Sequence, residues 1–240
     1  MNNPSVWSVL QRRWRETRAR KGRTAAAREI WADVWEFVRE STPERKRLRY
    51  GDVEYDWDHQ VDTTSATVSH RGRLMAALSG GPYQPTDPAE FREMLKGLAI
   101  DFGDFTFVDL GSGKGRTLLM ASEFGFRRIV GVELVPELHA IAKQNIAAWS
   151  SEGHRSTQIE SYCVDARDFV FPAEPLLVYL FNPLPEPALR VVIERLRKSV
   201  EAHPRELRVV YLNPILEHLL AQAGFLRRVD GSYRYAVYSN

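Results

Sequence analysis

Three alternating glycines behind a short apolar run constrain the fold of this chain more than any other feature. Residues 106–110, Thr-Phe-Val-Asp-Leu, are too few for a helix of their own and stop at Gly111, so they predict a buried strand of a mostly parallel sheet. Gly111, Gly113 and Gly115 omit side chains where a strand must turn sharply into a helix. A ligand can then approach the backbone, and the helix can pack closely on the sheet. The pattern predicts a strand-turn-helix unit with a binding site at its turn.

The residues after the glycines complete this site. A helix over about residues 114–124 directs free backbone N–H groups at the turn and ends at Gly125. The next apolar run, residues 129–133, ends in Glu133, 24 positions after Asp109. A carboxylate at that strand end can accept hydrogen bonds from two neighbouring hydroxyls, and a ribose has such a pair. Together the two units predict a nucleotide-type cofactor site.

The spacing of the glycines separates the cofactor classes that use such turns. A dinucleotide fingerprint that begins at Gly111 needs a small residue where this chain has Arg116. A phosphate-binding loop aligned on Lys114 needs a glycine at Val108 and a hydroxyl at Gly115, and both requirements fail. A dehydrogenase and a P-loop protein are therefore disfavoured.

The remaining pattern, Asp-Leu-Gly-x-Gly-x-Gly followed by Gly-Val-Glu, resembles motif I and the downstream acidic motif of the class I, seven-strand S-adenosylmethionine-dependent methyltransferases. The resemblance covers roughly residues 83–240. It implies a doubly wound α/β fold with a mostly parallel seven-stranded sheet, and S-adenosyl-L-methionine as the cofactor. In the family, motif I lies under the methionine part of the cofactor and the acidic motif holds the ribose. The cofactor-binding residues implied in these two motifs are Asp109, Gly111, Ser112, Gly113, Gly115, Glu133 and Leu134.

Two further segments extend the resemblance. The third strand, over residues 158–164, is followed by Asp165 and Ala166, where the family usually places an acid that meets the adenine amine. Asp168 is the alternative for that role. Upstream of a helix over residues 89–98, a Tyr-Gln-Pro-Thr run resembles the cofactor-covering loop of some seven-strand protein lysine methyltransferases. This similarity adds Tyr83 and Thr86 to the implied cofactor site.

The fourth strand, residues 176–181, ends in an Asn-Pro-Leu-Pro run that begins with Asn182. The run resembles the Asn-Pro-Pro-aromatic motif of amino-methylating members, in which the amide holds the target nitrogen. This implies a catalytic, acceptor-orienting role for Asn182 beside the cofactor, although Leu184 and Pro185 depart from the motif. A simple strand end is the alternative, since proline blocks the ladder and asparagine favours turns. Asn213, with a proline after it, is predicted to form only a turn.

The other patterns fit alternating strands and helices. They predict helices over residues 136–149, 186–202 and 215–223, a strand over 208–212, and a last hairpin of residues 225–229 and 233–238 around Asp230-Gly231. Residues 83–240 thus form the predicted methyltransferase domain.

The first 82 residues are expected to form two smaller parts. Residues 1–50 carry 13 Lys or Arg against 6 Asp or Glu and form a basic amphipathic helical arm, with Thr24 as a cap between two helices. Residues 51–82 form a connecting segment that can fold over the pocket as a lid. We expect the arm to pack its tryptophans on the catalytic domain or on a second subunit, as in a dimer. Contact with nucleic acid, an anionic membrane surface or an acidic protein is the alternative.

These observations favour a methyltransferase that acts on an amine nitrogen of a protein, such as a lysine, or of a small molecule. An amine requires less help from a base than a hydroxyl does, and no histidine stands in a motif position that demands one. A nucleic-acid methyltransferase that uses the basic arm, or an inactive cofactor-binding regulatory module, are the alternatives. No His and Cys cluster has metal-ligand spacing, so we expect no metal. Neither a signal-peptide core nor a membrane-spanning run is found, so we expect a cytoplasmic protein.

Overall fold

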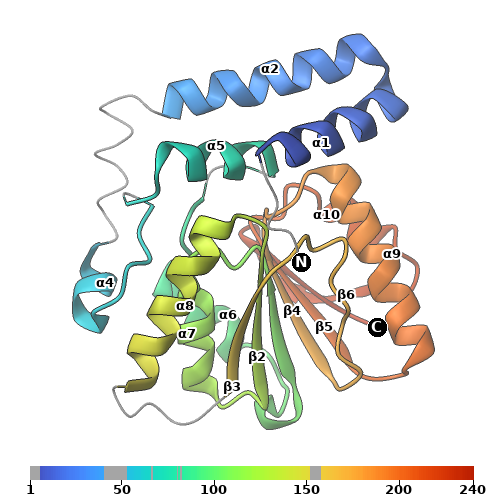
Figure 1. Cartoon of the computed structure of the whole chain (residues 1–240). Helices are drawn as coiled ribbons and strands as arrows, with labels where there is room; N and C mark the ends of the chain where they lie inside the picture. Colours follow the sequence, from blue (N-terminus) through green and yellow to red (C-terminus); the bar gives the residue numbers. More distant parts are fainter. Residues whose placement is uncertain (1–5, 41–52, 66, 80, 82, 152–157) are drawn as a thin grey trace.

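A seven-stranded sheet forms the centre of the computed structural model of this chain (Figure 1). The structure describes residues 6–40, 53–65, 67–79, 81, 83–151 and 158–240. The strands are β1 (Thr106–Leu110), β2 (Arg128–Glu133), β3 (Gln158–Cys163), β4 (Leu176–Phe181), β5 (Leu207–Leu212), β6 (Arg227–Gly231) and β7 (Tyr235–Ser239). Their order across the sheet is β3-β2-β1-β4-β5-β7-β6.

Helices precede and separate these strands. The N-terminal ones are α1 (Val6–Lys21), α2 (Arg23–Glu40), α4 (Val53–His59), α5 (His70–Ser79) and α6 (Pro88–Lys96). Those between the strands are α7 (Arg116–Ala121), α8 (Pro136–Ser151), α9 (Glu186–Ala202) and α10 (Glu217–Ala221), with short 3-10 turns at Phe102–Asp104 and Ser122–Phe124. The alternation confirms the predicted doubly wound α/β fold.

The register of the sheet brings the motif residues to one edge. The strand pairs from β3 to β5 are parallel, and β7 pairs antiparallel with both β5 and β6. Leu110 at the end of β1 lies level with Val132 of β2 and with Leu180 of β4. The loops after these strands therefore open at the same carboxyl edge, where doubly wound folds bind ligands.

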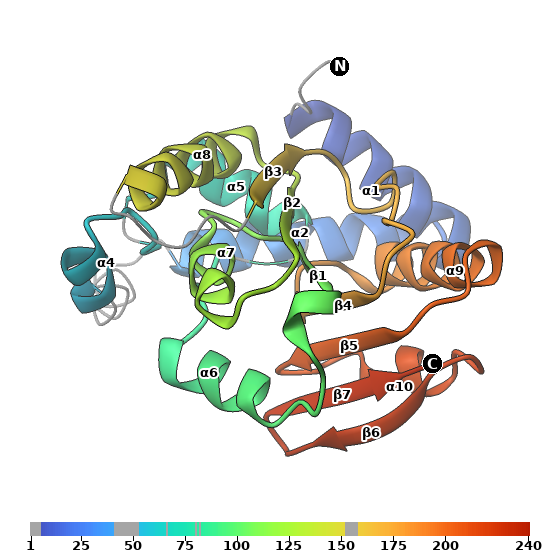
Figure 2. The same ribbon diagram turned by 90° about the horizontal axis from the view of Figure 1, so that it is seen from below.

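Both faces of the sheet are buried under helices, as the continuous apolar runs of its strands require (Figure 2). On one face Val108 and Val178 pack with residues of α9 and α10 in a single cluster. On the other face Phe107 and Tyr179 pack with residues of α6 and α7, with Phe91 edge-on to both rings. The two clusters hold the strands rigidly beneath the carboxyl edge.

A layer of N-terminal helices lies across that carboxyl edge (Figure 1). Helix α1 contacts both α2 and α5, and its Val9 is buried with Met75 and Leu78 of α5 and with Leu138 of α8. The N-terminal arm is thus part of the enclosure of the sheet edge. Among the described residues, no helix is both long enough and apolar enough to cross a membrane.

Two expectations for local structure are wrong. Asp230 and Gly231 belong to β6, so the last turn lies after them; the ladder shifts register between Arg228 and Asp230, which places the Asp-Gly pair inside an irregular strand. Helix α2 begins at Arg23, so Thr24 is its second residue and not a cap.

Three of the four tryptophans of the arm do not pack on the catalytic domain, and the fourth, Trp14, is half-buried. Trp7, Trp31 and Trp35 are 68%, 67% and 66% exposed. The helix docks instead through Val9 and Leu10 of α1. The predicted domain boundaries at residues 50 and 82 lie outside the described residues.

Candidate functional site

A cavity lies at the carboxyl edge of the sheet, between the loops after β1 to β4 and the helices α1 and α5. Of the cofactor residues that the sequence predicts, all except Gly113 and Gly115 line it. Asp168, the alternative acid, and Asn213, the comparison for Asn182, do not line it. The fold therefore gathers into one hollow residues that span about a hundred positions of the sequence, from Tyr83 to Asn182.

The glycine turn is closely covered from two sides. A Cβ atom at Gly111 would lie 2.3 Å from the Cβ of Pro183, and one at Gly113 would lie 2.2 Å from a ring carbon of Tyr83. Both glycines have positive φ angles, of 88° and 55°. Any other residue would therefore displace the proline or the tyrosine. The turn, the Asn-Pro strand end and the Tyr83 loop form one fitted unit.

Glu133 joins the glycine turn to the turn after β2. Its side chain is only 6% exposed; Oε2 accepts a hydrogen bond from the backbone N–H of Gly113 at 2.8 Å, and Oε1 accepts one from Val135 at 2.7 Å. Burial raises the pKa of this carboxyl, and the backbone N–H donors oppose the rise. Each oxygen keeps further acceptor capacity at the cavity wall, which suits a pair of ligand hydroxyls.

Asp109 lies deeper, beneath the turn. It is 3% exposed and accepts a hydrogen bond from the hydroxyl of Thr117. Burial raises its pKa to about 7; the Thr117 hydrogen bond opposes this rise, and the charge of Glu133 adds to it. A buried carboxyl poised near neutral pH can hold a cationic group of a ligand when it ionises.

Ser112 supplies a polar group that the protein itself leaves without a partner. Its Oγ atom is buried and has no hydrogen-bond partner among the described residues, and the residue lines the cavity. Buried hydroxyls are nearly always hydrogen-bonded in folded proteins. The unsatisfied Oγ is therefore an observation that points to a polar ligand in this cavity.

Asn182 and Asn213 have the same backbone conformation, but only Asn182 lies at the cavity. Its φ angle is 45° and that of Asn213 is 48°, so the left-handed conformation belongs to the Asn-Pro turn itself. Asn182 lines the cavity, and its Oδ1 accepts a hydrogen bond from the Tyr211 hydroxyl at 2.8 Å. This contact fixes the orientation of the amide at the cavity wall.

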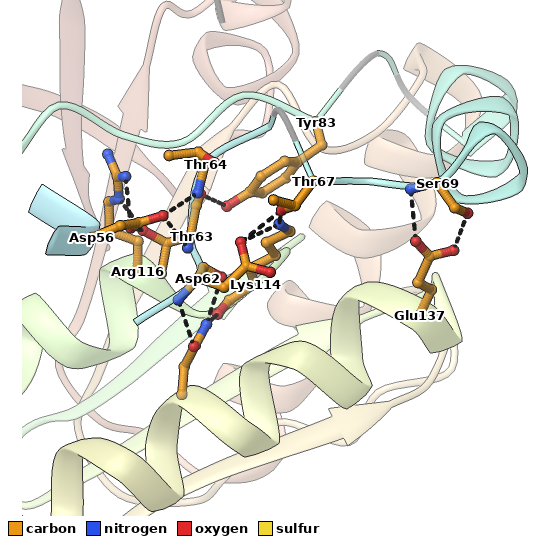
Figure 3. Close-up of polar contacts among 11 residues, drawn as sticks. Asp56, Asp62, Thr63, Thr64, Thr67, Ser69, Tyr83, Lys114, Arg116 and Glu137 are labelled. Atoms are coloured by element: carbon orange, nitrogen blue, oxygen red, sulfur yellow. Dashed lines mark hydrogen bonds and ion pairs between the residues drawn. The ribbon is translucent and has the colours of Figure 1, made fainter. Parts of the chain in front are cut away.

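Two buried cations of the glycine motif anchor the segment between α4 and α5 (Figure 3). Lys114 is fully buried, and its Nζ donates to Asp62 at 2.7 Å and to Thr67. The side-chain amide of Asn145 in α8 bonds the backbone of Asp62 and of Lys114 at 2.8 to 2.9 Å. The lysine thus stabilises the segment rather than a ligand phosphate.

Arg116 anchors the same segment from its other end. It is 1% exposed; its Nε donates to the Thr63 hydroxyl at 2.6 Å, and its Nη2 lies 3.3 Å from Asp56. Its guanidinium also lies over the Tyr55 ring, 4.7 Å from the centroid. The carbonyl of Thr63 in turn accepts the hydroxyl of Tyr83 at 2.7 Å, so the segment positions the ring that covers Gly113 (Figure 3).

The sequence did not predict part of the cavity wall. Helix α1 contributes Val9, Arg13 and Glu16, and Arg167 lies beside Asp165. The basic amphipathic pattern of the arm was visible in the sequence, but nothing in it indicates which part of the domain the arm covers. Only the tertiary contacts place α1 at the site.

Comparisons with known proteins find similarity to solved structures alone. No family model matches the chain, and no curated protein matches it. The chain is similar to a SAM-dependent methyltransferase from Aquifex aeolicus, with 17% identity and a TM-score of 0.46 over 65% of this chain and 98% of that one. It is also similar to the N-methyltransferase NodS from Bradyrhizobium japonicum WM9, with 14% identity and a TM-score of 0.45 over 64% of this chain and 93% of that one.

A third similar structure is an RNA methyltransferase from Salinibacter ruber in complex with S-adenosyl-L-homocysteine, with 22% identity and a TM-score of 0.39 over 65% of this chain and 92% of that one. All three are methyltransferases, the class that the sequence motifs resemble. Because each stands below 25% identity and below a TM-score of 0.5, the similarities carry no argument about the acceptor. The case for function rests on the strand order and the cavity.

The buried cation of Arg116 predicts a large stability effect. Replacing Arg116 with methionine leaves Asp56 without its guanidinium partner, and we expect a loss of about 3 kcal/mol in the free energy of unfolding in urea. Arg92→Met is the matched control, since Arg92 pairs with Glu123 at 3.0 Å but both side chains are about one-third exposed. We expect that variant to lose less than about 1 kcal/mol. Equal losses would contradict the anchoring role.

The raised pKa of Asp109 predicts a pH-dependent stability. Between its ordinary pKa of 3.8 and its folded value of about 7, the folded state keeps a proton that the unfolded state releases. Stability should therefore fall as pH rises from about 4 to 7 and level off above, by on the order of 4 kcal/mol. Asp109→Asn should remove this component. Urea unfolding of both proteins from pH 4.5 to 8 tests it, and a stability difference that stays constant with pH would contradict it.

Proposed function

We propose that this protein is a class I S-adenosylmethionine-dependent methyltransferase that transfers a methyl group to an amine nitrogen. The observation that carries the proposal is the position of Glu133. This buried carboxyl group, fixed by two backbone N–H groups, lies at the wall of a cavity that Gly111 and Ser112 of the glycine turn also line. That arrangement suits the ribose of a nucleoside ligand.

The residues present fit this cofactor. Glu133 would accept the ribose hydroxyls, Asp109 would take the cationic ammonium of the methionine part, and the unpartnered Oγ of Ser112 would find a polar partner. When bound, the cofactor supplies an electrophilic methyl group on a sulfonium. The protein has to hold donor and acceptor in line and keep water out. The closely covered turn under Tyr83 and Pro183 suits the exclusion of water.

The side chains that line the cavity favour an amine over a hydroxyl as the methyl acceptor. Among the described residues that line it there is no histidine to act as a general base. A neutral amine attacks a methyl group with less help from a base than a hydroxyl requires. Asn182, with its amide fixed by Tyr211, would orient that amine as an acceptor-positioning group. A protein lysine or a small-molecule amine both satisfy these conditions.

The nucleic-acid alternative has less support. Two cations of the arm, Arg12 and Arg20, lie 3.0 and 3.3 Å from Asp165 and Glu186 of the same chain, so they already neutralise internal acids. Leu184 and Pro185 line the cavity where an aromatic residue would be needed to stack a base. An inactive regulatory module remains the second alternative, and transfer assays separate it from an enzyme.

Calorimetric titration tests the cofactor assignment. We expect the purified protein to bind S-adenosylmethionine and S-adenosylhomocysteine, and not NAD or ATP. Glu133→Ala should weaken both ligands at least tenfold, because it removes the buried acceptor for the ribose. Binding of NAD or ATP instead, or no binding by a folded protein, would overturn the assignment.

Asn182→Ala serves as the matched variant in the same series. It should leave the cofactor affinity within about twofold and lower transfer of a labelled methyl group to amine acceptors at least tenfold, since it removes a group expected to touch only the acceptor. The acceptors to present are lysine-containing proteins of a cell extract and its small-molecule fraction. Unchanged transfer by Asn182→Ala would contradict its role, and tight binding without any transfer would indicate a regulatory module.

A further inference from the structure

The N-terminal helix α1 forms one wall of the cavity although it belongs to the arm outside the methyltransferase motifs. Val9, Arg13 and Glu16, three to four positions apart, share one helical face and all line the cavity. Val9 is buried against α5 and α8, and the Nη1 of Arg13 donates to the Leu78 carbonyl at 2.7 Å. The helix is thus seated by apolar packing at one end and by hydrogen bonds along its length.

The same helix is joined by ion pairs to the loop after β3. The Nη1 of Arg12 lies 3.0 Å from Asp165 and 3.2 Å from Asp168. Glu16, one turn further on, accepts a hydrogen bond from Arg167, whose side chain is only 10% exposed. A cation and an anion of α1 therefore both form ion pairs with residues of the loop after β3.

Asp165 is the centre of this network. Its Oδ1 accepts the backbone N–H and the Nε of Arg167, both at 2.9 Å, and its Oδ2 accepts the Nη2 of Arg167 at 2.7 Å and the Nη1 of Arg12 at 3.0 Å. A carboxylate has about four acceptor positions, so these donors use them all. Burial acts to raise the pKa of Asp165, but the hydrogen bonds and charge of Arg167, with the charge of Arg12, lower it below its ordinary value.

Fully engaged in this way, Asp165 fixes the loop and α1 relative to one another. The loop follows β3, next to the β2 end that carries Glu133. If Glu133 holds the ribose, as the proposed function requires, the base of the nucleoside extends toward this loop and toward the wall that α1 provides. The basic arm would then serve the cofactor rather than an external partner.

We propose that α1 is the closing wall of the adenine side of the cofactor site, held in place by Arg12 and Glu16 through Asp165 and Arg167. This proposal rests on the proposed function, since it assigns the arm to the same cofactor. Bound cofactor is enclosed by α1 and leaves only when the helix moves. Arg12 and Glu16 are therefore positioning residues for the wall.

A charge-matched pair of double variants tests the proposal. Arg12→Ala/Glu16→Ala removes the anchors. Arg18→Ala/Glu29→Ala removes one cation and one anion from the same arm at positions that do not line the cavity: Arg18 is exposed, and Glu29 is half-buried and pairs with Lys21 of the arm at 2.8 Å. We expect the first to bind S-adenosylhomocysteine roughly tenfold more weakly, mainly through faster dissociation, because each partly exposed anchor is worth up to about fivefold. The second should bind within about twofold of the wild type.

Hydrogen exchange gives a second readout, which reports on α1 itself and not only on ligand affinity. Saturating S-adenosylhomocysteine should slow amide exchange in α1, and this slowing should be lost in Arg12→Ala/Glu16→Ala. If the ligand binds and Glu133→Ala weakens it, but α1 exchange is unchanged and the two double variants bind alike, the role of α1 is overturned while the proposed function stands. If the folded wild type does not bind the ligand, both proposals are overturned.

Discussion

The rest of the site depends on two positions, Gly111 and Gly113, at which the chain can carry no side chain. At Gly111 and Gly113 the backbone approaches Pro183 and Tyr83 so closely that any side chain would collide with them. The strand end of β4 and the loop before α6 can therefore meet over a single turn after β1. The N–H of Gly113 is at the same time held by Glu133, so the turn, the covering loop and the acid of β2 are fixed together.

The cations inside the glycine motif extend this unit to the N-terminal third of the chain. Lys114 and Arg116 are too deeply buried to serve as solvent-facing anion ligands. Each finds carboxylate and hydroxyl partners in α4 and the segment after it. In the same segment, the carbonyl of Thr63 accepts a hydrogen bond from the hydroxyl of Tyr83. Buried charges are tolerated only when they are paired and hydrogen-bonded. The motif thus requires the preceding segment to fold against it.

The bounds of individual strands and helices could be predicted from short stretches of the sequence, because they depend on interactions within those stretches. The strands predicted at residues 106–110 and 176–181 and the helix predicted at 186–202 begin and end at the residues that the structure assigns to β1, β4 and α9. Strand length, flanking turn residues and apolar period decide these elements. The last hairpin was misplaced because an Asp-Gly pair favours a tight turn, whereas here the irregular pairing of β6 with β7 accommodates it.

The contacts of the arm could not be predicted in this way. Arg12 and Asp165 are 153 positions apart, and no periodicity relates them. The tryptophans of the arm were the strongest apolar signal, yet three of them face solvent while the smaller Val9 enters the core. Which face of an amphipathic helix docks depends on the surface it meets, and that surface exists only after the sheet has formed. The cavity residues near the glycine turn, such as Gly111 and Ser112, could be predicted as neighbours because one motif carries them together.

A crystal structure of the protein grown with S-adenosylhomocysteine tests the central claim most directly. The account predicts ligand density in the cavity at the carboxyl edge of the sheet, with the ribose hydroxyls on Glu133, the amino-acid end beside Asp109 and Tyr83, and α1 seated against the adenine side. Ligand density at another place, or a ligand bound in the cavity with α1 displaced from it, would contradict the account.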